Sequence, residues 1–166
     1  MASSVNGIIA RKNYEEDFLS DYNWTTFTSL AEEHGCVIMG RKTYDVVNKW
    51  EDHNFYAVNA RKIVLSRKVK KISTPGFQVA HSLQDALHQA KKLGFKTVLL
   101  SGGSKANSAF MKSNLIDEII LNVEPVVIGK GIHLFSEDSF EARLKLVHLK
   151  KLPNKILQLK YLVRKK

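Results

Sequence analysis

Residue types that bind phosphate follow three short apolar runs of the sequence. The segment 40–43 (GRKT) follows CVIM, the segment 66–68 (SRK) follows IVL, and the segment 101–104 (SGGS) follows TVLL. Glycine lets the backbone approach an anion closely. Free N–H groups at the start of a helix donate to phosphate oxygens, and Arg and Lys add positive charge. Together the three segments suit a ligand with several phosphates, such as a dinucleotide with an extra 2′-phosphate.

Each segment also has an ordinary structural explanation. A glycine pair between a strand and a helix is common turn chemistry, and Arg-Lys at a helix start is often a solvated surface. The interpretation as a phosphate site therefore rests on all three segments occurring together. Competing sites lack support, because the chain contains no G-x-x-x-x-G-K-[ST], no G-x-G-x-x-G and no G-x-S-x-G. The six histidines show no paired ligand spacing, so no metal site is predicted.

Alternating strands and helices are expected to position these segments. Helix 82–93 has Ser82 as its N-cap and Gly94 as its stop. Strands separated by helices of this length favour a mostly parallel sheet with helices on both faces. We read one α/β domain over 1–166, and two final strand-like runs predict an antiparallel hairpin at the sheet edge. The expected strands are 36–39, 63–65, 77–80, 97–100, 119–123, 143–150 and 156–163, and the other expected helices are 41–48 and one from the SGGS segment to about 113.

The charge of the chain is concentrated in two places. The net charge is +10, and residues 143–166 hold nine Lys or Arg and no acid, while residues 61–71 hold six and no acid. We expect the 61–71 patch to serve the phosphate ligand. In the tail, Leu157, Leu159, Tyr161 and Val163 alternate with other side chains, which predicts a half-buried edge hairpin whose basic outer face protects against edge-to-edge pairing.

The single cysteine and the short apolar runs indicate the cellular compartment. Cys36 is the single cysteine and lies among apolar neighbours, so we expect a buried, inert thiol in a reducing environment. No apolar run approaches 18 residues, and the N-terminus lacks the order of a signal peptide. The sequence therefore predicts a cytoplasmic protein without a membrane partner.

The quoted motifs resemble a known superfamily. VIMGRKTY (37–44), IVLSR (63–67) and LLSGGS (99–104) resemble dihydrofolate reductase in order and approximate spacing. NLIDEIILNVEPVVIGKGIHLF (114–135) is more similar to the pyrimidine-nucleotide reductase domain of riboflavin biosynthesis and its uncharacterised relatives. With SSVNGIIA (3–10), the resemblance covers most of residues 1–135. It implies a dihydrofolate reductase-like, mostly parallel eight-stranded sheet and an NADPH-dependent oxidoreductase. The family's first strand normally begins several residues before the position of Met1, so here either this strand is short or the start of the chain is missing.

The resemblance also implies where NADPH binds. The segment from Gly40 through Arg41 and Lys42 to Thr43 would bind phosphate at the first helix start. Ser66 and Arg67 would hold the 2′-phosphate side of the adenosine, which favours NADPH over NADH. Gly102, Gly103 and Ser104 would cradle the pyrophosphate, with a cis Gly102–Gly103 peptide, and the backbone of Ala2 would lie beside the nicotinamide carboxamide.

Three residues are implied on the substrate side. Dihydrofolate reductase places a carboxylate on its first helix to hold the pterin, and its counterpart here is Asn23, which cannot deliver a proton as a carboxylate does. Asp21 lies close enough in sequence to substitute, although it also suits a helix N-cap. Asn6 falls where the family has an Asp or Asn near the active-site loop, and it equally suits a turn. No side chain is assigned as the proton donor.

The leading hypothesis is an NADPH-dependent reductase that transfers a hydride to a small heterocyclic metabolite of the pyrimidine-ribose phosphate or pterin class. One alternative is dihydrofolate reductase proper with an altered acid position. A second alternative is a basic nucleic-acid-binding module without catalysis, and it is less favoured because Tyr161 is the only Phe, Trp or Tyr in the last 24 residues. The riboflavin-type relatives tend to be dimers, so the resemblance allows a homodimer.

Overall fold

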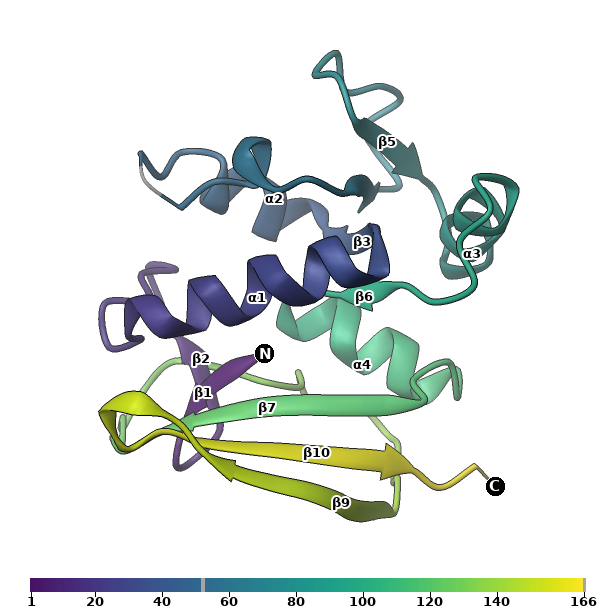
Figure 1. Ribbon diagram of the computed structural model, residues 1–166. Helices are drawn as coiled ribbons and strands as arrows, with labels where there is room; N and C mark the ends of the chain where they lie inside the picture. The colour runs from purple at the N-terminus through teal and green to yellow at the C-terminus, as the bar shows by residue number, and fades with distance from the viewer. Residues whose placement is uncertain (52, 166) are drawn as a thin grey trace. The chain divides into compact units, whose positions relative to one another are not determined.

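The computed structural model describes residues 1–51 and 53–165. Lys166, the last cation of the basic tail, lies outside the described residues. The chain divides into two compact units, the first formed by residues 1–24 and 107–166 and the second by residues 25–106 (Figure 1). Because α1 (Asp21–His34) and α4 (Ser104–Lys112) each span a boundary, each contributes residues to both units.

The second unit is built on a four-stranded parallel sheet. Its strands lie in the order β5 (Phe77–Ala80), β4 (Arg61–Leu65), β3 (Cys36–Gly40) and β6 (Leu99–Leu100). The first four residues of β3 have no exposed surface, as expected for a continuous apolar run that is covered on both faces of a parallel sheet. The helices α2 (Arg41–Val47) and α3 (Leu83–Lys92) pack against these strands, and a short 3-10 helix covers Phe55–Ala57.

The ends of α3 follow the sequence prediction. The Ser82 hydroxyl accepts a hydrogen bond from the Asp85 N–H at 3.0 Å, which confirms Ser82 as the N-cap. The Asp85 carboxylate in turn accepts from the His81 N–H at 2.8 Å, and this bond lowers the pKa of Asp85. Gly94 adopts a φ of +89° directly after the helix, a conformation that favours glycine and ends the helix.

The first unit contains a mixed sheet and a short antiparallel pair. In the mixed sheet β1 (Ala2–Ser4) runs parallel to β7 (Glu118–Glu124), which pairs antiparallel with β10 (Leu157–Val163). The strand β9 (Leu144–Lys151) pairs antiparallel with β10 and forms the edge, with a 3-10 turn at Pro153–Lys155 between them (Figure 1). The second pair consists of β2 (Ile8–Ala10) and β8 (Ile132–His133).

The strands do not form the single eight-stranded sheet that we expected. The described residues form three sheets, of four, two and four strands. Two strands are shorter than their apolar runs suggest, because β6 and β8 pair over only two residues each. A ladder of two residue pairs supplies few backbone hydrogen bonds, so the hydrogen-bonded network ends at these strands.

The tail is half-buried in one of its two strands. In β10, Leu159 and Tyr161 are half-buried and Val163 is 8% exposed, as the alternation predicts, although Leu157 is exposed. All eight residues of β9 are exposed, because β9 is the outermost strand of its sheet. Two tail lysines are paired with acids, Lys160 with Glu118 at 2.7 Å and Lys165 with Asp117 at 2.9 Å. These pairs reduce the positive charge that the tail offers to a nucleic acid.

Two buried side chains refine the sequence interpretation. Lys62 is 6% exposed, its Nζ donates to the Val58 carbonyl at 2.5 Å, and it lies 5.4 Å from the centre of the Phe77 ring. One of the six cations in the 61–71 patch is therefore part of the core and is not available to a ligand.

Cys36 is fully buried, and burial raises the pKa of its thiol to about 11, as expected for an inert cysteine. The described residues include no helix of the length and hydropathy that crossing a membrane requires.

Candidate active site

The predicted phosphate-binding segments meet at one edge of the second unit's sheet. All four strands are parallel, so their carboxyl ends share an edge. The strand order places four residues along this edge in the sequence His81, Ser66, Gly40 and Ser101, each at or directly after the end of its strand. Residues up to 61 positions apart in the chain lie along one line as a result.

Two of the segments are in direct contact. The Gly40 N–H donates to the Gly102 carbonyl at 2.6 Å, and the Ser101 N–H donates to the Ile38 carbonyl at 2.9 Å. The Gly102–Gly103 peptide bond is cis, as the resemblance implied. A Cβ atom on Gly103 would lie 2.9 Å from Oγ1 of Thr43. The structure therefore brings 40–43 and 101–104 together and leaves no room for a larger residue at position 103.

Ser101 carries an unsatisfied polar group at this edge. Its hydroxyl is buried and has no hydrogen-bond partner among the described residues. Leaving a buried hydroxyl without a partner costs about 1–3 kcal/mol. Ser101 lies three residues before the first residue of α4, a nine-residue helix whose first N–H groups lack intrahelical acceptors. These N–H groups suit an anion.

The cations at this edge differ in their availability. Arg41 forms an ion pair with Asp45, with Nε and Oδ1 separated by 2.6 Å, so a phosphate would have to compete with this carboxylate. Lys42 is exposed. Arg67 is exposed, and no carboxylate of the described residues lies within ion-pair distance of it. Arg67 can thus bind a phosphate without breaking an existing ion pair with a carboxylate.

Ser66 holds the turn that carries Arg67. Its hydroxyl accepts from the backbone N–H of Val69 at 3.0 Å and of Lys68 at 3.3 Å. Its carbonyl lies 2.8 Å from Nδ1 of His81, so that nitrogen carries the proton and Nε2 is left unprotonated in the neutral ring. Sequence reasoning missed His81, although its position directly after the strand Phe77–Ala80 is the same signal that selected the other segments.

On the first unit, Ala2 and Asn6 take well-defined positions. Ala2 lies opposite Asn122 in the parallel β1–β7 pair. Oδ1 of Asn6 accepts from the Ser4 hydroxyl at 2.9 Å and from the Ile128 N–H at 3.2 Å, while its Nδ2 donates to the Ile128 carbonyl at 2.8 Å. The amide of Asn6 is therefore engaged in holding a turn against a loop, which is the structural role that the sequence also allowed.

The two helix positions expected to face the substrate differ in burial. Asp21 is exposed and is the first residue of α1. Asn23 is 9% exposed, its Nδ2 donates to Oε1 of Glu124 at 2.6 Å, and its Oδ1 accepts from Nδ2 of Asn122 at 2.9 Å. A carboxylate thus lies beside the position where the related reductases have one, and it comes from the end of β7. Sequence reasoning missed Glu124 because the expected strand stopped at residue 123; an acid at a strand end followed by proline was the available signal.

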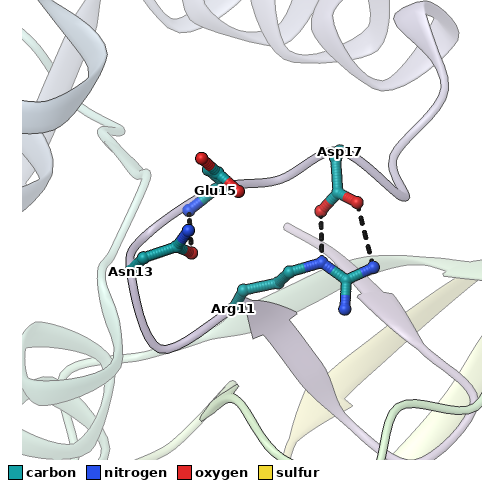
Figure 2. Close-up of polar contacts among 4 residues, drawn as sticks. All are labelled: Arg11, Asn13, Glu15 and Asp17. Carbon is teal, nitrogen blue, oxygen red and sulfur yellow. Dashed lines mark hydrogen bonds and ion pairs between the residues drawn. The ribbon is translucent and has the colours of Figure 1, made fainter.

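A compact loop precedes α1 in the same unit (Figure 2). Arg11 donates to both carboxylate oxygens of Asp17, from Nε at 2.6 Å and from Nη2 at 2.9 Å, while Oδ1 of Asn13 accepts from the Glu15 N–H at 3.2 Å. The hydrogen bond with Asp17 raises the pKa of Arg11 and, with the arginine's charge, lowers that of Asp17. The paired side chains close the loop over residues 11–17.

The loop carries one acid with an unusual environment. Glu16 is mostly buried, and desolvation raises the pKa of its carboxyl to about 7. Burial likewise lowers the pKa of the Met1 amino group to about 6, and this group donates to the Ile120 carbonyl at 2.9 Å. Nothing in the sequence indicates that Glu16 is buried, because it lies between two other acids, Glu15 and Asp17, that are both exposed. No group of three or more His, Cys, Asp or Glu in the described part of the chain is arranged to hold a metal ion.

Known proteins resemble this chain along its whole length. The uncharacterised protein YyaP of Bacillus subtilis is 26% identical over 171 residues, which cover 97% of this chain and 91% of YyaP. The crystal structure of a candidate riboflavin biosynthesis protein from Shewanella sp. PV-4 superposes with a TM-score of 0.84 at 24% identity, and the match covers 99% of this chain and 97% of that one.

A larger enzyme shares the fold over part of its length. The diaminohydroxyphosphoribosylaminopyrimidine deaminase/5-amino-6-(5-phosphoribosylamino)uracil reductase of Thermotoga maritima has a TM-score of 0.75 at 18% identity, and the match covers 98% of this chain and 55% of that enzyme. These structural likenesses establish an α/β fold of the dihydrofolate reductase type. The sequence pattern of the RibD C-terminal domain matches residues 1–158. This chain therefore belongs to the RibD C-terminal domain family.

Proposed function

We propose that the chain is an NADPH-dependent reductase that acts on a small heterocyclic metabolite of the pyrimidine-ribose phosphate class. Membership of the RibD C-terminal domain family supports reductase chemistry. The Thermotoga maritima relative is named as a reductase of 5-amino-6-(5-phosphoribosylamino)uracil, and it supports the substrate class. The features below concern the residues of this chain that would serve such a reaction.

The contact between 40–43 and 101–104 is the observation that carries the proposal. The Gly40–Gly102 hydrogen bond of 2.6 Å and the close approach of Gly103 to Thr43 create a surface of backbone and small side chains. The first N–H groups of α4 follow this surface in the chain. Backbone N–H groups and hydroxyls at a helix start are suited to a diphosphate, so these residues fit the pyrophosphate of a dinucleotide.

Arg67 supports a preference for NADPH over NADH. It follows β4, on the β5 side of Gly40 in the strand order, and it has no carboxylate partner among the described residues. A guanidinium binds phosphate through charge-assisted, often bidentate hydrogen bonds. NADH lacks the 2′-phosphate and would gain nothing from this contact.

The protein's part in the reaction is binding and orientation. When bound, the reduced nicotinamide supplies the hydride that a C=N bond of the substrate accepts. Ala2 would hold the carboxamide through its backbone, and the residues around Asn23 would hold the heterocycle. The substrate nitrogen also needs a proton, and we assign this proton to water.

Gly40→Ala tests the cofactor site with little risk to the fold. A Cβ at Gly40 would lie 3.5 Å from the Gly102 oxygen and 3.7 Å from Cβ of Ala106, and the backbone has an ordinary φ of −71°. We therefore expect an unchanged melting temperature but at least about tenfold weaker NADPH binding, measured by the change in NADPH fluorescence, because the methyl group fills the approach to the backbone. The matched control is Gly129→Ala, whose Cβ would meet nothing within 4 Å. Absence of NADPH binding by the wild-type protein would overturn the proposal.

A substrate screen distinguishes a pyrimidine-ribose phosphate reductase from a dihydrofolate reductase. NADPH oxidation is followed by absorbance with 5-amino-6-(5-phosphoribosylamino)uracil in one arm and dihydrofolate in the other. We expect turnover in the first arm. Turnover of dihydrofolate alone would assign the chain to dihydrofolate reductase activity, and NADPH binding without turnover in either arm would contradict the proposed substrate class.

A further inference from the structure

A buried row of polar side chains crosses the first unit and ends at Glu124. Gln158 Nε2 donates to Oδ1 of Asn122 at 3.0 Å, and Asn122 Nδ2 donates to Oδ1 of Asn23 at 2.9 Å. Asn23 Nδ2 then donates to Oε1 of Glu124 at 2.6 Å. Asn23, Asn122 and Glu124 are each less than 10% exposed. The three amides are thus oriented alike, each with its N–H group toward the carboxylate.

The two oxygens of Glu124 have different surroundings. Oε1 accepts from the Ser20 N–H at 3.0 Å, from the Ser20 hydroxyl at 2.9 Å and from Asn23 at 2.6 Å. Oε2 accepts no hydrogen bond from any described residue, and no Lys, Arg or His of the described chain forms an ion pair with Glu124. The carboxylate therefore has one saturated oxygen and one with free lone pairs.

Oε2 is not fully enclosed, although Glu124 as a whole is only 5% exposed. The fully enclosed side-chain atoms without a partner in the described chain belong to Asn48 and Ser101, and Oε2 is not among them. Glu124 lies opposite Ser4 in the β1–β7 pair, two positions along from the pair of Ala2 and Asn122. Glu124 thus lies on the strand that pairs with the strand of Ala2, the residue that we place beside the nicotinamide.

We propose that Oε2 of Glu124 binds a ring N–H group of the substrate, which makes Glu124 a residue that selects rings with an unsubstituted nitrogen. The inference rests on the proposed function and adds the anchor that the helix position Asn23 lacks. Ser20 and Asn23 fix Oε1, which leaves the carboxylate no freedom to exchange its oxygens. A charged acceptor held in one orientation forms strong hydrogen bonds with N–H donors and excludes rings that lack one.

The test uses ligand binding in the presence of saturating NADPH. Calorimetry with 5,6-diaminouracil and with 1,3-dimethyl-5,6-diaminouracil compares two rings that differ in their ring N–H groups. We expect wild-type protein to bind the first ring at least about tenfold more tightly than the second. Equal affinities, or no binding of 5,6-diaminouracil, would overturn the inference, and this arm needs no variant.

Glu124→Gln gives the second arm. Ser20 and Asn23 continue to donate to the amide oxygen, so the amide NH₂ replaces Oε2 and opposes the ring N–H. We expect at least about tenfold weaker binding of 5,6-diaminouracil, loss of the preference over the dimethyl compound and unchanged NADPH binding. The matched control is Glu118→Gln on the same strand, which is exposed and paired with Lys160. If Glu124→Gln binds 5,6-diaminouracil as tightly as wild type does, the role of Glu124 is refuted. If the wild-type protein does not bind NADPH at all, the proposed function itself is refuted.

Discussion

Burial of Glu16 makes the stability of the protein depend on pH in a predictable direction. Desolvation raises the pKa of this carboxyl from an ordinary value of 4.5 to about 7. A raised carboxyl pKa means that the folded protein binds the proton more tightly than the unfolded chain does. The contribution to stability is therefore complete below about pH 4.5 and is lost as the pH rises through 7.

The substitution Glu16→Gln removes this titration and keeps the shape of the side chain. A pKa difference between 4.5 and about 7 corresponds to at most about 3 kcal/mol, and residual solvent at the side chain reduces this value. We expect Glu16→Gln to be more stable than wild type by about 1–3 kcal/mol at pH 8 and equal to it at pH 4. In a chain of 166 residues each kcal/mol changes the melting temperature by about 2–4 °C.

The assay is thermal unfolding of both proteins at several pH values between 4 and 8. The Met1 amino group acts in the opposite direction, because its lowered pKa of about 6 gives stability above about pH 8 that is lost as the pH falls. The two groups are coupled, because the Met1 charge lowers the pKa of Glu16 and the Glu16 charge raises that of Met1. The difference between the two proteins therefore reports Glu16 together with its effect on Met1. Glu15→Gln, which alters the exposed neighbour, is the control and should show no such difference. A Glu16→Gln protein that is no more stable than wild type at pH 8 would refute the reasoning.

Two further outcomes follow from the described side chains. Arg67→Ala should weaken NADPH binding about tenfold or more and leave NADH binding unchanged, whereas Lys68→Ala should have little effect; equal losses for both cofactors would remove Arg67 from the 2′-phosphate site. Lys62→Met should be at least as stable as wild type in urea unfolding, because desolvation lowers the pKa of this buried lysine; a loss above about 2 kcal/mol would show that its hydrogen bond to Val58 outweighs that cost.

Local patterns in the sequence predicted the parts of the fold that depend on local physics. The strand at Phe77–Ala80 and the cap at Ser82 appear where the sequence placed them, because apolar runs and capping side chains act on near neighbours. The segments around Gly40 and Ser101 were also recognisable, since strand ends in a parallel sheet share an edge. The strand expected over 97–100 is shorter, because only Leu99–Leu100 pairs with β3.

The unpredicted parts depend on contacts between distant residues. Glu124 acquires its environment from Ser20 and Asn23, which lie more than 100 positions away. The burial of Lys62 and Glu16 depends on what the fold places around them, and a charged residue in a sequence gives no sign of this. The exposure of the β9 leucines likewise depends on the fold, because a strand is half-buried only where a second layer covers one of its faces.

Titration of NADPH into the wild-type protein, with NADH as the paired ligand, tests the central claim most directly. We expect saturable NADPH binding that is at least about tenfold tighter than NADH binding, with the difference lost in Arg67→Ala. Equal binding of the two cofactors would contradict the assignment of the 2′-phosphate to Arg67. Absence of binding by either cofactor would contradict the account of the sheet edge as a dinucleotide site.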